Sequence, residues 1–149
     1  TKDFFLFGSE VTPVIVFPYT SEGNIVAIKQ FRYGVNEFVV ELPGGCPKPG
    51  QSPEDTVQAE LLEETGYEYQ TLKRLKDGCW FDPASWLNHY VPYVALGCKK
   101  VREPQLGSTE LIEVVEFSLS QWNELMHDPA NRADSKTLAL TLLAWPHLG

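Results

Sequence analysis

The sequence lacks long apolar runs and closely spaced cysteines, and each shortage excludes a class of protein. No stretch reaches the roughly 18 apolar residues of a membrane-spanning helix, and no basic segment followed by an apolar run opens the chain. We therefore expect neither a membrane span nor a signal peptide. The three cysteines, Cys46, Cys79 and Cys98, are too far apart for a zinc or redox pair, which favours free thiols and a reducing cytoplasm.

Basic residues are too few and too scattered to follow a nucleic-acid backbone. The chain has 12 Lys and Arg against 20 Asp and Glu, a formal net charge of −8, and no basic run. Polymeric nucleic acid is normally bound by clustered cations that neutralise its phosphates, so we expect no such partner. A small anionic substrate remains compatible with this charge if a metal cation or a local group of basic side chains holds it.

Length and composition indicate one domain that spans residues 1–149. The chain is 43% hydrophobic, so it can bury one substantial core, and it is too short for two ordinary domains.

Apolar, β-branched runs at residues 11–17 and 24–30 flank a turn at residues 19–23 and predict a hairpin. Residues 38–42 predict another strand, and the Pro- and Gly-rich residues 43–50 predict an ordered loop.

The rest of the chain predicts a central helix, more strands and two closing helices. Ser52 is the expected cap of the central helix and Gly66 its stop. Further strands are expected at residues 71–76, 89–96 and 111–117. Pro92 in the middle one suggests an edge position or a bulge. The last two helices are expected to start at Ser118 or Ser120 and at Asp134 or Ser135. This order predicts an α/β layered domain with a mixed sheet.

Three glutamates of the central helix share one face. Glu60, Glu63 and Glu64 lie at positions i, i+3 and i+4, which places their carboxylates side by side. Such like-charge pairs weaken a bare helix by about 0.2–0.5 kcal/mol each, so the face is either solvated or holds a cation. The Gly-rich loop leads directly into this helix and can aim its carbonyls at the same point, which suits Mg²⁺ or Mn²⁺.

The segment from Gly45 to Tyr67, GCPKPGQSPEDTVQAELLEETGY, resembles the Nudix box. That box is a Gly, five residues, a Glu, seven residues and then Arg-Glu-aliphatic-x-Glu-Glu-x-Gly-aliphatic. Five of its seven fixed positions are kept at the family's spacing: Gly45, Glu60, Glu63, Glu64 and Gly66. Gln51 stands where the family has Glu, and Ala59 stands where it has Arg.

The resemblance extends to residues 11–117. Gln30-Phe-Arg-Tyr-Gly34 and Glu41-Leu-Pro-Gly-Gly45 are similar to the stretch before the box in ADP-ribose and nucleoside-diphosphate-sugar pyrophosphatases, and Pro83 resembles the proline marker of the ADP-ribose group. The resemblance implies a Nudix-type α/β/α sandwich with a mixed sheet. It also implies hydrolysis of the pyrophosphate bond of a nucleoside diphosphate linked to another group, with ADP-ribose or a nucleotide sugar favoured. It leaves a homodimer open.

The resemblance also assigns metal ligands and catalytic residues. Glu60 and Glu64 are the implied main ligands of Mg²⁺ or Mn²⁺, Glu63 assists, and the Gly44 carbonyl adds an oxygen. Glu63 and Glu64 are the implied catalytic residues. Bound ions of this kind place charge where the transition state develops it and lower the pKa of a bound water.

The substrate contacts implied by the resemblance lie in and before the box. Arg32 is the candidate for binding phosphate, Glu41 for contacting the terminal sugar or base, and Gly45 for lining the site. A surface ion pair is the alternative role for Arg32. Three aromatics have base stacking as one role and packing as the alternative: Trp80, Phe81 and Trp86. The histidines are assigned structural or surface roles: His89, His127 and His147.

Three departures from the family pattern bear on activity. Ala59 cannot make the ion pair with Glu63 that an Arg would make, a loss of about 1.5–3 kcal/mol. Gln51 keeps a hydrogen-bonding oxygen. Asn88 stands near the place where the ADP-ribose group carries an acid, and the loss of a general base costs roughly 10²–10⁴-fold. Other acids could take that role: Glu103, Glu110, Glu113 or a Glu of the box.

These patterns support a metal-dependent Nudix pyrophosphohydrolase that acts on a small nucleotide. The first alternative is a catalytically weakened Nudix-like domain that binds a nucleotide or a partner without turning it over. The second is an acidic α/β domain unrelated to metals.

Overall fold

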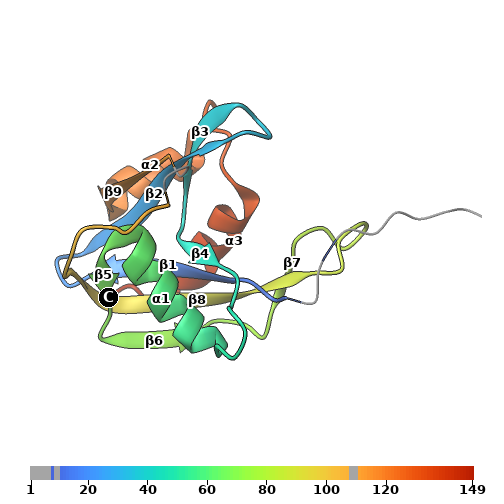
Figure 1. The fold of residues 1–149 in the computed structure, drawn as a ribbon. Helices are drawn as coiled ribbons and strands as arrows, with labels where there is room; N and C mark the ends of the chain where they lie inside the picture. Colours follow the sequence, from blue (N-terminus) through green and yellow to red (C-terminus); the bar gives the residue numbers. More distant parts are fainter. Residues whose placement is uncertain (1–7, 9–10, 108–110) are drawn as a thin grey trace, which may run out of the picture.

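A computed structural model describes residue 8 and residues 11–107 and 111–149 of the chain (Figure 1). Its elements, in chain order, are β1 Val14–Thr20, β2 Asn24–Arg32, β3 Glu37–Glu41, β4 Gly44–Gly45, α1 Pro53–Thr65, β5 Tyr67–Glu68, β6 Thr71–Arg74, β7 Cys79–Trp80, β8 His89–Lys100, β9 Ile112–Ser118, α2 Leu119–His127, α3 Ser135–Ala144 and the 3-10 helix η1 Trp145–His147. All but three of the strands correspond to segments predicted from the sequence.

The sheet is mixed, as predicted. Its strand order is β3-β2-β1-β8-β5, with β9 on β2, β4 on β1, and β6 and β7 on β8. β1 and β8 run parallel, from Val14 opposite Val91 to Thr20 opposite Cys98, whereas the other pairings are antiparallel. A parallel pair of this kind needs a long crossover, and here α1 lies within that crossover.

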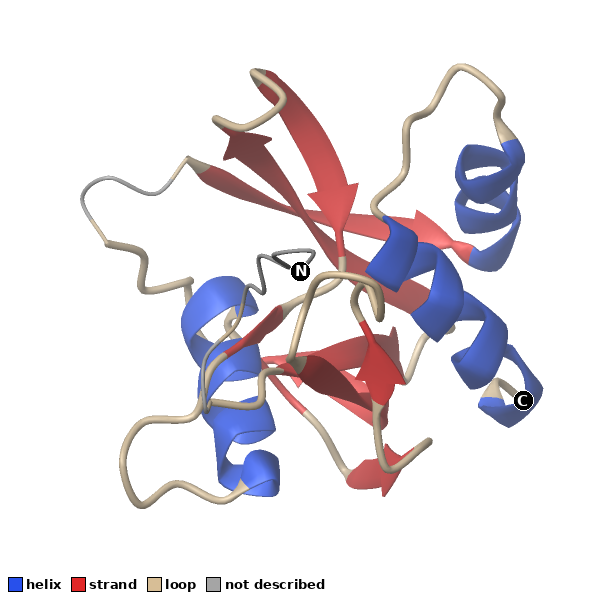
Figure 2. Cartoon of the chain, turned by 90° about the vertical axis from the view of Figure 1, so that its right-hand side faces the viewer, coloured by secondary structure: helices blue, strands red, loops and turns tan. Residues whose placement is uncertain are grey.

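The sheet separates two apolar cores because alternate residues of β1 point to opposite faces. Val14 and Val16 pack in the core that α1 closes with Val57 and Leu61. On the other face, Ile15 and Phe17 pack in the core that α2 and α3 close with three buried side chains, Trp122, Leu140 and Ala144. One helix therefore lies on one side of the sheet, and the two helices before the C-terminus lie on the other (Figure 2). The predicted α/β/α sandwich is confirmed.

Helix α1 begins and ends where its capping residues predict. The Ser52 hydroxyl accepts a hydrogen bond from the Asp55 backbone N–H at 3.0 Å, and Pro53 occupies the first turn. Gly66 ends the helix at φ 79°, a left-handed conformation that favours glycine. A Cβ at this position would lie 1.9 Å from the Arg102 carbonyl oxygen, so space as well as backbone geometry requires glycine.

The two later helices are also capped by predicted residues. Ser118 caps α2 and exchanges hydrogen bonds with Gln121 in a capping box, which settles the choice between Ser118 and Ser120. Asp134 caps α3 and accepts a hydrogen bond from the Thr137 backbone N–H at 3.1 Å. Within the described residues, no helix is long and apolar enough to cross a membrane.

Pro92 does not mark an edge or a bulge, so that prediction was wrong. β8 lies inside the sheet, and its pairing with β1 is regular at Pro92, opposite Ile15. On its other side, β6 pairs only as far as Tyr93, and β7 starts to pair at Tyr90. Pro92 therefore falls between two partner strands, where a missing N–H costs no ladder hydrogen bond. The short strands β4, β5 and β7 were not predicted from the sequence.

Candidate active site

The Gly-rich loop begins as a two-residue strand fastened to β1. Gly45 pairs with Val14 and Gly44 with Ile15, and the Val16 N–H donates to the Pro43 carbonyl at 2.9 Å. A Cβ at Gly44 would lie 2.4 Å from the Val14 carbonyl oxygen. The backbone of β4 can therefore approach β1 this closely only because position 44 has no side chain.

The loop and helix α1 meet at Gly45 and Glu60. A Cβ at Gly45 would lie 2.4 Å from Cδ and 2.6 Å from Oε1 of Glu60, so the carboxyl group of Glu60 packs directly against the glycine backbone. This contact joins the first glycine of the segment to the first glutamate of the helix face. One carboxylate of the helix face, that of Glu60, thus reaches the Gly-rich loop.

The three glutamates of α1 have different neighbours. Glu60 packs against Gly45, Glu64 lines a cavity beside Gly44 and Gly45, and Oε1 of Glu63 lies 3.9 Å from Nζ of Lys48. Among the residues that the structure describes, no group of three or more His, Cys, Asp or Glu side chains is arranged to hold a metal ion. The metal-ligand assignment therefore stays a prediction.

A cavity of about 180 Å³ brings together five of the predicted site residues, and we call it the inner cavity. Those five are Arg32, Glu41, Gly44, Gly45 and Glu64. Its floor is the N-terminal part of β1, and its wall includes Asp134 and Lys136 at the start of α3. Residues before the Nudix-like box and residues inside it thus line one cavity.

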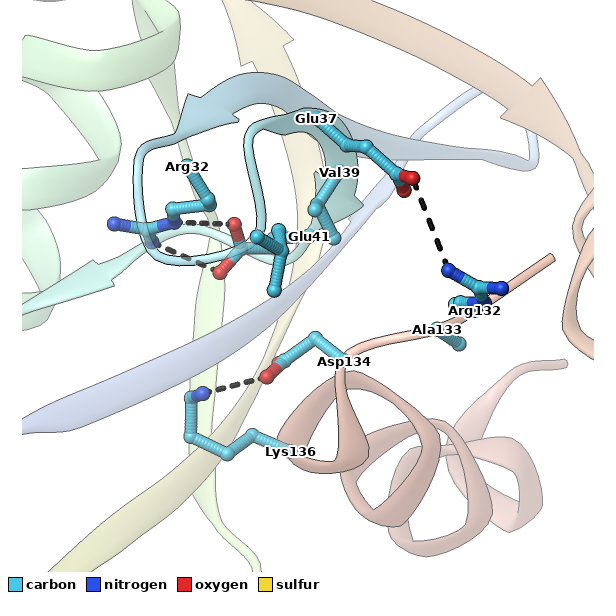
Figure 3. Close-up of a pocket in the computed structure, with 9 residues that line it drawn as sticks. Arg32, Glu37, Val39, Glu41, Arg132, Ala133, Asp134 and Lys136 are labelled. Carbon is cyan, nitrogen blue, oxygen red and sulfur yellow. Dashed lines mark hydrogen bonds and ion pairs between the residues drawn. The ribbon is translucent and has the colours of Figure 1, made fainter.

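Arg32 and Glu41, which line this cavity, form a two-point ion pair; Figure 3 shows the pair from a neighbouring pocket. Nε of Arg32 donates to Oε2 of Glu41 at 2.6 Å, and the guanidinium NH2 group donates to Oε1 at 2.9 Å. Glu41 is only 6% exposed, whereas about half of the Arg32 side chain is exposed. The hydrogen bond with Glu41 raises the pKa of Arg32, with the nearby charges of Asp134 and Glu64 acting in the same direction. The ion-pair alternative for Arg32 is therefore observed, and Arg32 lines the cavity with about half of its side chain exposed.

Two further charged residues of the site, Asp134 and Lys136, lie at the start of α3, and their place in the site was not predicted from the sequence. Nζ of Lys136 lies 2.6 Å from Oδ1 of Asp134, whose Oδ2 accepts hydrogen bonds from the backbone N–H and hydroxyl of Thr137. The Thr137 hydroxyl also accepts from the Leu42 N–H at 3.3 Å, which ties α3 to the end of β3. The sequence marked Asp134 only as a helix start, because its position beside Glu41 depends on how α3 packs against the sheet.

The family model of the NUDIX domain matches residues 10–140 of this chain. The chain belongs to the Nudix family. It is 35% identical over 111 residues to an ADP-ribose pyrophosphatase of Bacillus subtilis (strain 168), across 71% of this chain and 57% of that protein. It is 33% identical to a methanol dehydrogenase activator of Bacillus methanolicus over 72% of this chain and 58% of that protein. The chain therefore spans little more than half the length of these relatives.

A more distant relative and a solved structure agree with this family. The chain is 32% identical to an ADP-sugar pyrophosphatase of Mus musculus over 62% of this chain and 44% of that protein. The crystal structure of an ADP compounds hydrolase superposes with a TM-score of 0.79 at 20% identity, covering 95% of this chain and 74% of that one. At this identity the structural likeness establishes the Nudix fold alone.

Gln51, which replaces a Glu of the Nudix box, fastens the loop. Its Oε1 accepts a hydrogen bond from the Lys48 backbone N–H at 2.9 Å and lies 3.5 Å from the Thr56 hydroxyl. Both are contacts that the oxygen of an amide or a carboxylate can make. The sequence-based view that Gln51 retains a useful oxygen agrees with these contacts.

Ala59, which replaces the Arg of the Nudix box, leaves Glu63 with a different cation nearby. The ammonium group of Lys48 lies 3.9 Å from Glu63, and both side chains are largely exposed. Pairs of this kind contribute about 0.2–1 kcal/mol, less than a buried Arg pair. The backbone N–H of Lys48 donates to Gln51. Gln51, at one altered box position, therefore helps to position the cation that lies near Glu63 in place of the Arg missing at the other altered position, Ala59.

Asn88 fixes the backbone near residue 11 and does not line the inner cavity. Its Nδ2 donates to the Val11 carbonyl at 2.7 Å. Of the other acids considered for the general base, Glu103 pairs with Lys100 at 2.8 Å, and Glu113 is exposed on β9. Glu110 lies outside the described residues. Glu64 is thus the box carboxylate that the structure places in the cavity.

The three aromatic candidates separate into one cavity residue and two surface residues. Phe81 lines the inner cavity and packs against Tyr90, with ring centroids 5.1 Å apart. Trp80 and Trp86 are 62% and 45% exposed and pack against His89 and Phe81, respectively. Packing, the alternative from the sequence, describes their observed contacts.

Proposed function

We propose that this Nudix domain hydrolyses the pyrophosphate bond of a nucleoside diphosphate linked to another group, with ADP-ribose or a nucleotide sugar as the favoured substrate. The observation that supports the proposal is the inner cavity, where Gly45 and Glu64 of the box meet Arg32, Glu41 and Gly44 from the segment before it. Relatives named for ADP-ribose and ADP-sugar pyrophosphatase activity support the same substrate class.

Three residues of the inner cavity have roles in this proposal: Arg32, Glu41 and Glu64. The exposed edge of Arg32 binds a phosphate oxygen of the substrate, while Glu41 holds the guanidinium plane in place. Glu64 and Glu63 are the proposed catalytic carboxylates. A fixed Arg beside the reacting phosphates lowers the cost of the negative charge that develops there.

Nudix domains generally need divalent metal ions, and we propose Mg²⁺ or Mn²⁺ for this one. The oxygen donors fit such an ion: Glu60 and Glu64 as main ligands, Glu63 and the Gly44 carbonyl as additional ones. Glu64 and Gly44 line the same cavity, and Glu60 contacts the adjoining Gly45. Held by these residues, such an ion would activate water and offset the negative charge of the pyrophosphate. We propose the cytoplasm as the compartment, which the three free cysteines support.

A second candidate function is a Nudix domain that binds such nucleotides with weakened turnover. It is favoured by Asn88, which bonds the backbone near residue 11 and provides no base. In this case the Arg32–Glu41 pair would still recognise a phosphate group.

The test combines turnover and binding on one set of compounds. Phosphate release is measured by phosphatase coupling from ADP-ribose, nucleotide sugars, dinucleoside polyphosphates and nucleoside triphosphates, each with Mg²⁺ or Mn²⁺ and with EDTA. Glu64→Gln is compared with Glu124→Gln, the same chemical change on an exposed face of α2.

We expect turnover of ADP-ribose or a nucleotide sugar that Glu64→Gln abolishes and Glu124→Gln leaves unchanged. Metal-dependent binding of the same compounds without turnover would favour the weakened domain. Neither binding nor turnover for any compound would refute both candidates.

A further inference from the structure

A second pocket of about 520 Å³ adjoins the inner cavity, and we call it the outer pocket (Figure 3). It is lined by Arg32, Val35, Glu37, Val39, Glu41, Arg132, Ala133, Asp134 and Lys136. Four of these residues also line the inner cavity: Arg32, Glu41, Asp134 and Lys136. A molecule whose pyrophosphate lies in the inner cavity would therefore extend directly into the outer pocket, whose volume is within the ordinary range for small-molecule sites.

The outer pocket is rich in hydrogen-bonding groups but carries no net charge. Its three cations match its three carboxylates, and each cation lies beside one of them. Arg32 is 2.6 Å from Glu41, Lys136 is 2.6 Å from Asp134, and the more exposed Arg132 is 3.8 Å from Glu37. A phosphate group is normally bound by an excess of cations, and three carboxylates in the wall oppose it. Alternating donors and acceptors instead suit a neutral group with several hydroxyls.

The apolar residues that line the outer pocket suit a sugar ring better than a nucleobase. Val35, Val39 and Ala133 supply it, and no aromatic ring is among the described residues that line the outer pocket. Nucleobases are usually bound by stacking on aromatic rings. The small aliphatic side chains can contact the C–H groups of a sugar ring while the charged pairs bind its hydroxyls.

We propose that the outer pocket binds the neutral sugar beyond the pyrophosphate, and that Lys136 and Asp134 determine the preference for it. This inference rests on the proposed function only for placing the pyrophosphate in the inner cavity. Asp134 is held by Thr137 and Lys136, and 17% of its side chain is exposed, so its carboxylate is presented in one fixed orientation. The Asp134 carboxylate can accept a hydrogen bond from one sugar hydroxyl, while the Lys136 ammonium group donates a hydrogen bond to the adjacent hydroxyl.

The test measures what the sugar adds to binding, which does not require turnover. The dissociation constants of α,β-methylene ADP and α,β-methylene ADP-ribose are measured by calorimetry with Mg²⁺, and their ratio gives the contribution of the sugar. The wild type is compared with Lys136→Gln, which removes a charged donor, and with Ala133→Trp, which fills the pocket. Lys99→Gln on the exposed end of β8 is the matched control.

We expect the wild type and Lys99→Gln to bind the sugar compound more tightly than α,β-methylene ADP. Lys136→Gln should lower that ratio about three- to tenfold, the effect of one charge-assisted hydrogen bond in a partly exposed pocket. Ala133→Trp should bring the ratio close to one. Ala133 does not line the inner cavity, so in Ala133→Trp the affinity for α,β-methylene ADP should change less than twofold. Thermal melting verifies that both variants fold.

The outcomes separate this inference from the proposed function. A sugar preference that both variants lose supports the outer pocket, whether or not the wild type turns over ADP-ribose. Turnover with a ratio that neither variant changes would overturn the outer pocket and leave the proposed function standing. Tighter binding of ATP than of ADP-ribose analogues, lost in Lys136→Gln, would identify a phosphate site and overturn the inference.

Discussion

The contact between Gly45 and Glu60 predicts a variant that loses function without losing its fold. In Gly45→Ala the new Cβ would lie 2.4 Å from Cδ of Glu60, against an ordinary minimum of 3.4 Å, so the carboxyl group must move by about 1 Å. Gly45 is not among the glycines with positive φ, so alanine strains no backbone angle there. Because the atoms met belong to a flexible side chain, the cost is about 0.5–1.5 kcal/mol, as for an off-rotamer glutamate.

The expected result is a small change in melting temperature and a large change in activity. A loss of about 1 kcal/mol lowers the melting temperature of a domain of this size by about 2–4 °C. A 1 Å misplacement of a catalytic or metal-binding group can cost about a hundredfold in kcat/KM. The assays are scanning calorimetry, with and without Mg²⁺, and steady-state turnover of ADP-ribose.

A remote glycine provides the matched control. Gly23 lies in the turn between β1 and β2 with φ 88°, and a Cβ there would meet only the Tyr19 hydroxyl at 3.4 Å. Gly23→Ala should therefore lose about 1–2 kcal/mol through backbone strain while keeping full activity. If Gly45→Ala retained more than a third of the wild-type kcat/KM, the position of the Glu60 carboxylate would not matter and the reasoning would be refuted.

Three further predictions concern charges and thiols. Lys48→Met should lower kcat/KM about two- to fivefold, the effect of losing one exposed ion pair. Adding Ala59→Arg to this variant should restore kcat/KM, and an unchanged kcat/KM in Lys48→Met would contradict the prediction. The Arg74 hydrogen bond lowers the pKa of Glu54 below its usual 4.5, so this pair stabilises the fold above that pH and the effect is lost as the pH falls through the lowered value. Urea unfolding of Glu54→Gln should thus show a stability loss at pH 7 that disappears near pH 2, and an equal loss at both would be the contrary result. Burial raises the pKa of Cys98 to about 12, so this thiol should react with a disulfide reagent at pH 8 only after unfolding, and rapid labelling of the native chain would contradict the buried position.

Elements with strong local signals were predicted closely. The central helix has a capping serine, a proline in its first turn and a terminal glycine, and all three act within a few residues of the chain. Ser52 and Gly66 therefore mark its ends in the structure as they do in the sequence. The loop and helix of the Gly45–Gly66 segment were also predicted in the right order, because the distance along the chain from a loop to the helix after it is a local property.

Features that depend on distant partners were not predicted. The strands β4, β5 and β7 have two residues each, too few to show an alternating pattern. They form because parts of β1 and β8 extend beyond their longer partner strands. The role of Pro92 depended on where β6 ends and β7 begins. Lys136 lies at the cavity because Leu140 and Ala144 pack α3 against the face of the sheet opposite α1.

The parallel pairing of β1 with β8 constrains how the chain can fold while it is being synthesised. Val14 pairs with Val91, which is synthesised 77 residues later. Both cores contain side chains from β1 and β8. Until β8 leaves the ribosome, the β1–β2 hairpin presents an apolar edge with unpaired backbone groups, the kind of surface at which chains associate. A ribosome that stalls before residue 98 should therefore yield a fragment that aggregates or is degraded, and no partial product should retain activity.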